Sequence, residues 1–363
     1  MKVYKGTDEN MVCHGKQYVL GEMVTEEKAK LCECGLHACE MPLDVLNYYP
    51  PNRSRYFEAE ADDVTDERHS NDSKIVAKKM TLKAEIGIPG LVKAQVEYVK
   101  KQIGFDDAIK RADAEKENHA TGDWGAASAT GDCGAASATG DWGAASATGY
   151  QGAASATGDC GAASATGNRG AASATGDLGA ASATGYQGAA SATGNQGAAS
   201  ATGNRGAASA TGDLGAASAT GYQGAASATG DLGAASATGD WGAASATGYQ
   251  GAASATGDCG AASATGNQGA ASATGDWGAA SATGYQGAAS ATGKAGVALA
   301  AGFECKAKGA LGCAICCAER GKWDGEMYPI LAVKAAIVDG EMIKADTWYM
   351  LKNGEFVEVV END

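Results

Sequence analysis

The sequence predicts a mainly β protein: a β-solenoid of nonapeptide repeats, flanked by a small N-terminal α+β domain and a C-terminal β cap. A nine-residue unit, Ala-Thr-Gly-x-x-Gly-Ala-Ala-Ser, recurs nineteen times without a gap between residues 120 and 290, and such short strict periods are typical of solenoids. The chain has 54 glycines but only five prolines, which excludes a collagen triple helix. The two variable positions separate into two chemical sets when every second unit is read. We therefore expect each coil of the solenoid to consist of two nine-residue units.

Composition divides the 363 residues into five parts. An N-terminal α+β domain of mixed composition is joined by a charged helical linker to the repeats. After the repeats, Gly and Ala persist among larger apolar residues, as expected of terminating coils, and a strand-like tail with turn signals at Asp339-Gly340 and Asn353-Gly354 follows. A cap is expected because an open solenoid end exposes a strand edge. The five parts are 1–110, 111–119, 120–290, 291–320 and 321–363.

Hydrophobic periodicity predicts the elements of the N-terminal part. Leu91, Val92, Val96 and Val99 fall on one helical face, and Pro89 suits a helix start. Residues 106–118 are charged and are predicted to form a second helix. The other predicted elements are strands at Lys2–Lys5, Gln17–Leu20, Arg55–Ala61 and Ser73–Glu85, and helices at Pro42–Tyr49 and Pro89–Ile103.

Each repeat unit is long enough for one short strand, as in residues 126–130. Because side chains alternate along a strand, Ala127 and Ala129 share one face, while the Ala, Ser and Thr at 126, 128 and 130 share the other. We expect the face with two alanines to point inward, between two sheets. The opposite orientation stays an alternative, because Ser and Thr hydroxyls can satisfy one another along a stack. The glycine pair brackets a corner whose variable residues point outward.

The corner residues predict two chemically different edges of the rod. One edge is acidic, whereas the other alternates Tyr with Asn and places Arg beside the asparagines. The edges exchange character after Asp231, as the gain or loss of one unit would produce. The aromatic corners are expected either to form a ladder that contacts a partner protein or a glycan, or to pack between coils. The candidate binding residues are Asp123, Trp124, Asp141, Trp142, Tyr150, Asp159, Arg169, Asp177, Tyr186, Arg205 and Tyr222.

Eleven cysteines at irregular spacing fit reduced thiols better than a disulfide framework. Four side chains near the N-terminus offer zinc ligands, although their spacing differs from the paired Cys-x2-Cys knuckles of structural zinc sites. Buried thiols are the alternative interpretation, and the sequence predicts neither a metal nor a cofactor. The weak metal candidates are Cys32, Cys34, His37 and Cys39.

The formal net charge is −15, from 43 acidic and 28 basic residues. Phosphate neutralisation requires clustered Lys and Arg, so direct nucleic-acid binding is not expected. The chain opens with no signal-peptide pattern and contains no run of about eighteen apolar residues. We therefore expect a cytoplasmic protein that makes no membrane contact. An acidic rod can also imitate nucleic acid and bind a host protein.

Short motifs of the N-terminal part occur together at 3–6, 34–40, 42–45, 48–51, 54–56 and 83–87, including Cys-Gly-Leu-His-Ala-Cys-Glu and Tyr-Tyr-Pro-Pro. This pattern resembles an uncharacterised family of phage and prophage proteins from gut bacteria, whose members often carry Gly-Ala-Ala-Ser-Ala-Thr-Gly arrays and a similar tail. The resemblance implies a phage protein, in the host cytoplasm or associated with the virion. That family has no assigned activity, so no mechanism follows.

A more distant likeness concerns ADP-ribosyltransferase folds. Tyr-Lys-Gly-Thr at 4–7, Gly-Leu-His at 35–37 and the aromatic pair at 48–49 are similar to segments that border the NAD pocket there. This likeness implies candidate catalytic roles for Tyr4, His37 and Tyr48. The chain departs from that pattern, because no His precedes Gly6 and no clear catalytic Glu lies on a late strand. Glu58 and Glu60 are the only candidates.

These observations favour a non-enzymatic structural or interaction protein, in which a rigid acidic solenoid is a spacer or a binding surface. An ADP-ribosyltransferase-like N-terminal domain on a solenoid, active or inactive, is the second hypothesis, and a nucleic-acid mimic is the third. We expect a protein partner whose identity the sequence does not specify. Flat sheets of identical small side chains are self-complementary, so a homodimer through a solenoid face is also predicted.

Overall fold

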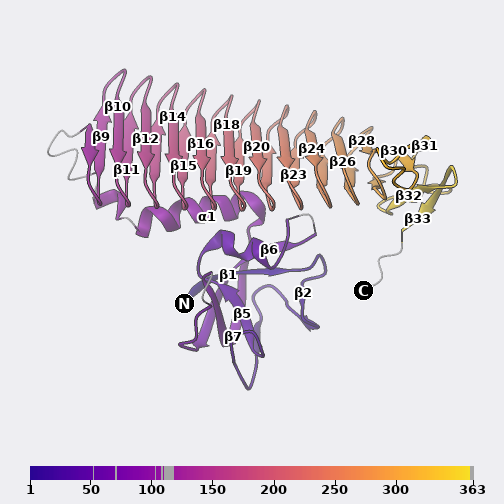
Figure 1. Cartoon of the computed structure of the whole chain (residues 1–363), viewed down its shortest axis with the longest axis horizontal. Coiled ribbons are helices and arrows are strands. Elements are labelled where there is room, and N and C mark those ends of the chain that lie inside the picture. The colour runs from indigo at the N-terminus through magenta and orange to yellow at the C-terminus, as the bar shows by residue number, and fades with distance from the viewer. Residues whose placement is uncertain (52, 70–71, 103, 108, 110–117, 360–363) are drawn as a thin grey trace.

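The computed structural model describes residues 1–51, 53–69, 72–102, 104–107, 109 and 118–359. A β-solenoid of about 11 turns occupies residues 119–317. The small N-terminal domain lies along one side of this rod, and a C-terminal strand region closes its far end (Figure 1). The predicted fold class is confirmed.

The strands of the N-terminal domain form a sheet that closes on itself. The first strand pairs with the fifth and the sixth, and the seventh also pairs with both. Val3, Phe57, Ile75, Met80 and Leu82 fill its interior with at most 1% of each side chain exposed. The strands are β1 (Lys2–Thr7), β2 (Val12–Cys13), β3 (Lys16–Gln17), β4 (Met23–Thr25), β5 (Leu36–Cys39), β6 (Arg55–Val64) and β7 (Lys74–Glu85).

One prediction for this domain needs correction. The predicted strand at Gln17–Leu20 is wrong, because only Gln17 belongs to a strand. Tyr18 instead donates its backbone N–H to the Met11 carbonyl, and Met11 takes the left-handed conformation that ends regular pairing. The predicted helix over 106–118 lies mostly outside the described residues.

Two helical segments connect the domain to the rod. The 3₁₀ helix η1 (Pro42–Asn47) packs on α1 (Gly87–Gln102), which begins two residues before the predicted Pro89. The apolar face predicted for α1 is buried. Its contacts are with the solenoid as well as with the domain.

The solenoid consists of short strands in two parallel sheets. After β8 (His119–Thr121), identical Ala-Ala-Ser-Ala-Thr strands recur with the nine-residue unit, from β9 (Ala126–Thr130) to β27 (Ala288–Thr292). Each strand pairs in register with the next strand but one, as Ala135 does with Ala153, so one coil contains two units, as predicted. We call the sheet of β8, β10 and the following even-numbered strands up to β30 the open sheet, and the sheet of β9, β11 and the following odd-numbered strands up to β29 the covered sheet.

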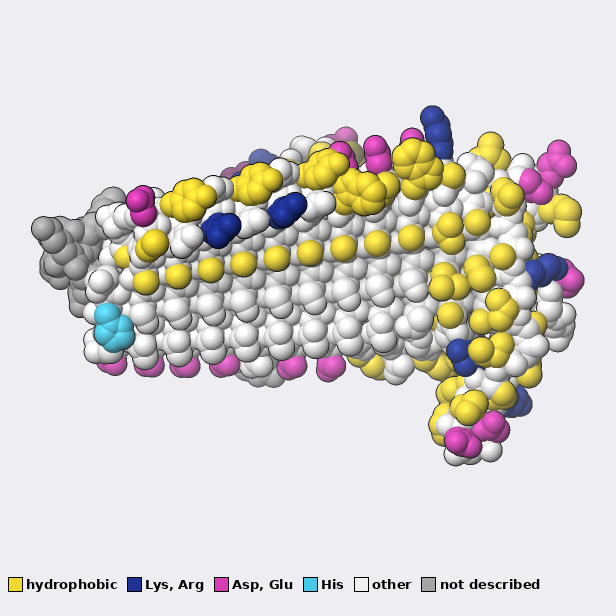
Figure 2. All heavy atoms as spheres, turned by 90° about the horizontal axis from the view of Figure 1, so that it is seen from above, with side chains coloured by type: hydrophobic (Ala, Val, Ile, Leu, Met, Phe, Trp, Pro, Cys, Tyr) yellow, Lys and Arg dark blue, Asp and Glu magenta, His cyan; other side chains and the backbone are white. Residues whose placement is uncertain are grey.

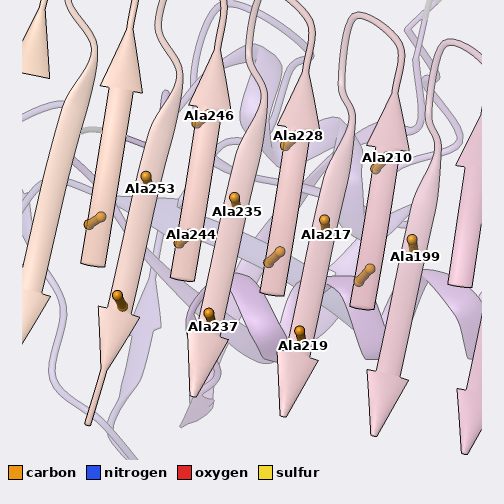
Figure 3. Close-up of a cluster of buried hydrophobic side chains, with 14 of the residues drawn as sticks. Ala199, Ala210, Ala217, Ala219, Ala228, Ala235, Ala237, Ala244, Ala246 and Ala253 are labelled. Atoms are coloured by element: carbon orange, nitrogen blue, oxygen red, sulfur yellow. The ribbon is translucent and has the colours of Figure 1, made fainter. Parts of the chain in front are cut away.

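Alanine alone fills the space between the two sheets of the repeat region. Figure 3 shows Ala199 and Ala217 of the covered sheet opposite Ala210 and Ala228 of the open sheet. Each of these four side chains is at most 1% exposed. The inward orientation of the two-alanine face is therefore confirmed, and the alternative with hydroxyl ladders inside is wrong. The small methyl groups allow close approach of the sheets, while the hydroxyls of the open sheet keep their contact with water.

The first glycine of each corner is required by stacking. Gly140 has a φ of +151°, and a Cβ added there would lie 1.7 Å from the Gly122 carbonyl oxygen of the preceding coil. The backbone ladder also continues through the corner, since the Trp142 N–H donates to the Asp123 carbonyl over 2.8 Å. Coils can therefore stack directly only while this corner position stays Gly.

Larger residues replace alanine where the solenoid ends. β28 (Val297–Ala300), β29 (Lys306–Gly309) and β30 (Ala314–Arg320) continue the coil, and Cys305, Cys313 and Ile315 enter the core. β31 (Ile330–Ile337) then pairs antiparallel with β30 and extends the open sheet. β32 (Tyr349–Lys352) and β33 (Glu355–Glu358) extend the covered sheet in the same antiparallel manner. The parallel ladder thus ends on antiparallel strands.

Helix α1 lies on the outer face of the covered sheet (Figure 1). The helix crosses five strands, from β13 (Ala162–Thr166) to β21 (Ala234–Thr238). Beneath it the outward alanines Ala162, Ala180, Ala198 and Ala216 are fully buried. The equivalent alanines of the open sheet, such as Ala171, are exposed. Two sheets of one sequence therefore have different surroundings.

Candidate functional site

A cavity of about 1500 Å³ opens in the N-terminal domain. Its walls come from β1, the β2–β3 hairpin, the segment around β5, and η1 with the turn that follows. Tyr4, His37 and Tyr48, the three side chains suggested by the transferase likeness, all line it. The volume exceeds the roughly 300–1,000 Å³ of typical small-molecule sites. The cavity is the candidate ligand site of this chain.

Gly6 allows an aromatic ring to form one wall of the cavity. A Cβ at Gly6 would lie 2.4 Å from Cγ of Tyr49, so only Gly lets this ring pack against β1. The Tyr49 hydroxyl lies 2.6 Å from Sγ of Cys13. Burial, followed by this contact with Cys13, raises the pKa of Tyr49. The Tyr49 phenol is therefore neutral at physiological pH.

Lys5 places a cationic group deep in the cavity wall. The residue is 2% exposed, and its Nζ donates to the His37 carbonyl over 2.9 Å and to Cys13 Sγ over 3.0 Å. The ammonium also lies over the rings of Tyr18 and Tyr49, at 5.4 and 5.5 Å from their centroids. Aromatic faces stabilise a desolvated cation. The arrangement can thus hold a positive charge beside a thiol.

His37 is a hydrogen-bond acceptor in this cavity. Its Nε2 accepts the backbone N–H of Cys32 at 3.0 Å. Burial lowers the pKa of His37 to about 4, and the nearby ammonium groups of Lys74 and Lys5 act in the same direction. The imidazole is therefore neutral at physiological pH, and its contact with Cys32 fixes its position.

Tyr48 also lines the cavity and belongs to a charged cluster. Its hydroxyl donates to the Asp72 carboxylate, and Lys74 Nζ lies 4.1 Å from the centre of its ring. Burial raises the pKa of Tyr48, and the Asp72 carboxylate reinforces the shift. Tyr4 is 6% exposed, and burial likewise raises the pKa of its phenol. These tyrosines are therefore neutral hydrogen-bonding groups.

The weak metal candidates do not converge. Cys32 and Cys34 are exposed, whereas Cys39 is buried and its thiol pKa is raised by burial. Within the described ranges, no three His, Cys, Asp or Glu side chains are grouped to hold a metal ion. Near the other end of the chain, Cys305 and Cys317 point into the terminal core, where burial raises the pKa of both thiols, that of Cys317 to about 12.

The predicted binding residues of the solenoid lie on two edges of the open sheet. The Asp edge comprises the corners at 123–124, 141–142 and every second corner onward, and the Tyr edge comprises the alternate corners, from 132–133 and 150–151 onward. Figure 2 shows a row of acidic side chains along one edge and aromatic and basic side chains along the other. The exposed members are Asp123, Asp141, Asp159 and Asp177 on the first, and Tyr150, Arg169, Tyr186, Arg205 and Tyr222 on the second.

The two predicted tryptophans stack on each other. Trp124 and Trp142 have ring centroids 5.1 Å apart and planes inclined by 8°. Trp124 is 63% exposed, whereas Trp142 packs against the cluster beneath α1. Both expectations for the aromatic corners are therefore met at this position: the two rings pack between coils, and Trp124 presents an exposed aromatic surface.

From Cys160 onward, the second residues of the Asp-edge corners were not identified from the sequence as a site. Cys160, Leu178, Leu214 and Leu232 turn under the N-terminal domain and pack in the cluster of α1. Between them, the polar Gln196 donates from Nε2 to Oδ1 of the buried Asp44 over 2.7 Å. Apolar residues at successive corners of one edge were the signal that could have revealed this contact.

The change of edge character after Asp231 coincides with the end of the helix contact. β21, which follows Leu232, is the last strand that α1 crosses. Beyond it the Asp-edge corners carry glutamines that bond to one another, from Gln250 to Gln268 over 2.8 Å and from Gln268 to Gln286 over 3.4 Å. Pairing stays in register throughout. The two halves of the edge thus correspond to covered and uncovered lengths of the rod.

Residues 1–94 match a family described as a domain of unknown function (DUF7666). This match covers the N-terminal part of the expected family resemblance, which also included the repeats and the tail, and the phage origin stays a prediction. Comparisons with curated proteins and with solved structures gave no match. Among the described residues, no helix is long and apolar enough to cross a membrane. A domain of unknown function joined to a β-solenoid fits a structural or interaction protein.

Proposed function

We propose that this chain is a non-enzymatic interaction protein, in which the solenoid is a rigid mount for the N-terminal domain and a spacer that carries a binding surface. Docking of α1 across five strands is the observation that supports the mount. Through this contact the cavity is held at one place along the rod. A partner that binds the cavity would therefore be presented at a fixed position relative to the sheet faces.

The energetics of the docked helix favour a permanent contact. Leu91, Val92 and Val99 are at most 1% exposed, and Val96 is 4% exposed. Burying a Val or Leu side chain contributes about 1.5–3 kcal/mol. The Asp44–Gln196 hydrogen bond fixes the position of the helix and domain along the sheet. Small side chains on the sheet make this close approach possible.

Small-angle X-ray scattering of a Val92→Asp, Val96→Asp double variant tests the mount. A carboxylate has no partner beneath the helix, so the domain should leave the rod and the radius of gyration should rise. Lys93→Asp on the exposed face of α1 is the control and should scatter like the parent. A parent chain whose scattering already requires a detached domain would overturn the proposal.

A second candidate, an ADP-ribosyltransferase-type activity, is favoured by one observation: Tyr4, His37 and Tyr48 share a cavity. Glu58 and Glu60 weigh against it, because they pair with Lys2 and Lys83 and neither lines that cavity. Incubation with labelled NAD and a host lysate decides between the two. Transfer of label that His37→Gln abolishes would contradict the non-enzymatic proposal, and absence of transfer would remove this candidate.

The nucleic-acid mimic remains the third proposal. The exposed acid row of Figure 2 supports it, since a line of carboxylates is what a DNA- or RNA-binding protein would contact. Such a partner should be captured at low salt and released at high salt. Failure of several purified nucleic-acid-binding proteins to bind at low salt would count against it. A phage protein in the host cytoplasm or virion is the setting we propose.

A further inference from the structure

The open sheet presents a long uncovered face. Ala, Ser and Thr side chains form three outward columns along it, and a single shallow hollow runs from His119 to Leu299. Figure 2 shows the alanine column as a continuous apolar row between the two edges. Strands such as β14 (Ala171–Thr175) expose all three outward residues.

On the covered sheet, a helix buries the alanine column of the strands that it crosses. There, α1 reduces the outward alanines to 0% exposure. Because the strand sequences of the two sheets are identical, the open sheet offers the same packing surface without an occupant among the described residues. A face that packs well against Leu and Val side chains on one sheet can pack on the other.

The open sheet becomes strongly apolar toward its C-terminal end. Val297 and Leu299 are 44% and 36% exposed, and Val333 and Ile337 on β31 are 62% and 66% exposed. Register places Val297 beside Ala314, and Ala314 beside Ile337, in continuation of the outer alanine column. Scattered apolar residues are ordinary on a surface, but a contiguous group of them marks a contact site. We call these four residues the end patch.

We propose that a second copy of this chain covers the open sheet, in a parallel, face-to-face dimer whose two-fold axis runs along the rods. This dimer rests on the proposed function, because it assigns the proposed binding surface to a second copy of the chain. A face-to-face two-fold interface joins the same surface of both copies. With the axis along the rods, the end patch of one copy meets the end patch of the other.

The charged corners that border β14 and β18 favour this orientation. Rotation about an axis along the rod brings the Asp edge of one copy over the Tyr edge of the second copy. Asp177 then faces Arg169, and Asp213 faces Arg205, because each pair borders the same strand. The antiparallel arrangement centred on β18 would instead place Asp213 over Asp213 and Arg205 over Arg205, where like charges repel, and Asp177 over Tyr249. It would also separate the two end patches.

The area of the open sheet is sufficient for a stable dimer. Eleven strands from β8 to β28 at about 4.8 Å spacing span roughly 50 Å, and five residues span roughly 16 Å. Each copy would therefore bury on the order of 800 Å², which is the size per partner of a standard specific interface. The N-terminal domain sits on the covered sheet and leaves this face clear.

Sedimentation velocity of the full chain over a wide concentration range tests the dimer. The parent should sediment at twice the chain mass, and Ser227→Arg, in the middle of the open sheet, should sediment as a monomer. Ser272→Arg puts the same side chain at the same repeat position on the covered sheet, beyond α1, and should stay dimeric. A monomeric parent, or a dimer that Ser227→Arg leaves intact, would overturn the proposal. Neither result would alter α1 docking, which scattering measures separately.

Disulfide mapping tests the orientation. Ser155→Cys and Ser263→Cys lie near opposite ends of the central column. In the parallel dimer, each variant should cross-link to itself under mild oxidation, and peptide mapping should identify each self-link against the native cysteines. If instead only a mixture of the two variants cross-links, joining position 155 to position 263, the arrangement is antiparallel and the proposal fails.

Removing the basic residues of the Tyr edge tests the charge argument. Arg169→Gln with Arg205→Gln should weaken the dimer about tenfold, because four exposed ion pairs at about 0.2–1 kcal/mol each are lost. Lys93→Gln with Lys101→Gln, on the exposed side of α1, is the control that makes the same change in net charge. An unchanged dissociation constant for the double variant would contradict the parallel pairing of the edges.

Discussion

The two sheets of the solenoid have the same strand sequence and different surroundings. On the covered sheet, the first alanine of β17 (Ala198–Thr202) is completely buried beneath α1, whereas on the open sheet the first alanine of β18 (Ala207–Thr211) is exposed. The strands cannot cause this difference. It arises at the corners, where Cys160, Leu178 and Leu214 turn toward the helix on one edge only. In this rod the repeated residues form the scaffold. The variable corner residues determine which sheet packs against the helix.

The largest expected effect on the unfolding free energy comes from the corner glycines, which both edges of the solenoid share. Gly203 and Gly212 begin the two kinds of corner, and a Cβ at either would lie 1.5 or 1.7 Å from a carbonyl oxygen of the preceding coil. Gly203→Ala and Gly212→Ala should therefore each lower the unfolding free energy by about 3 kcal/mol or more. Urea denaturation measures both. Markedly unequal losses would break the symmetry of the scaffold.

A second effect should arise where the two sheets differ in what covers them. Ala198→Asp places a carboxylate beneath α1 and should cost about 2–3 kcal/mol, because the charge loses its water without gaining a partner. Ala207→Asp places the same group at the equivalent position of the open sheet and should change the unfolding free energy by less than about 0.5 kcal/mol in the monomer. Equal effects in urea denaturation would show that the two faces are equally covered.

A smaller effect is expected at the polar contact between domain and rod. Gln196→Ala removes the hydrogen bond to Asp44, which is 1% exposed and also accepts the Ser73 N–H at 2.7 Å. A loss of about 1 kcal/mol in the unfolding free energy should follow. Gln187→Ala, on the Tyr edge, should leave the free energy unchanged. If the two variants behave alike in urea denaturation, the Asp44 contact does not hold the domain.

Acid should destabilise the N-terminal domain through His37. We expect this effect to be the smallest, because the imidazole is only half-buried. Its folded-state pKa of about 4 lies below the ordinary 6.5. Between these values the unfolded chain binds a proton that the folded domain does not, so stability is greatest above pH 6.5 and falls toward pH 4. His37→Gln should flatten this part of the profile in urea denaturation. A parent with no pH dependence there would mean that the imidazole is not desolvated.

The sequence was sufficient to predict the solenoid because every coil repeats the same local interactions. The two-unit coil followed from the alternation of the corner residues, and the inward face followed from side-chain alternation in residues 126–130. Both rest on short-range geometry that one or two units already contain. The apolar face of α1 was predicted for the same reason, since Leu91, Val92, Val96 and Val99 recur with the helical period.

Contacts between distant segments were not predicted. Nothing in the periodicity of α1 said that its apolar face would lie on the solenoid, although Cys160, Leu178 and Leu214 place apolar side chains along one edge of the rod. The cavity was reached only through a likeness that made Tyr4, His37 and Tyr48 candidates. Lys5 and Cys13 were missed as a pair, because their contact depends on how the β2–β3 hairpin folds over β1. Such contacts depend on tertiary packing rather than on local pattern.

Thiol protection at two matched positions tests the central claim most directly. Ala171→Cys in the open sheet and Ala180→Cys in the covered sheet each put a thiol at the same repeat position, on opposite faces of the rod. In the parent, Ala171 is exposed, whereas Ala180 is 0% exposed. In dilute, monomeric protein the open-sheet thiol should react rapidly with a maleimide and the covered one at least tenfold more slowly. At dimer-forming concentrations both should be protected. Equal rates in dilute protein would contradict the assignment of one face to α1 and the other to a second copy.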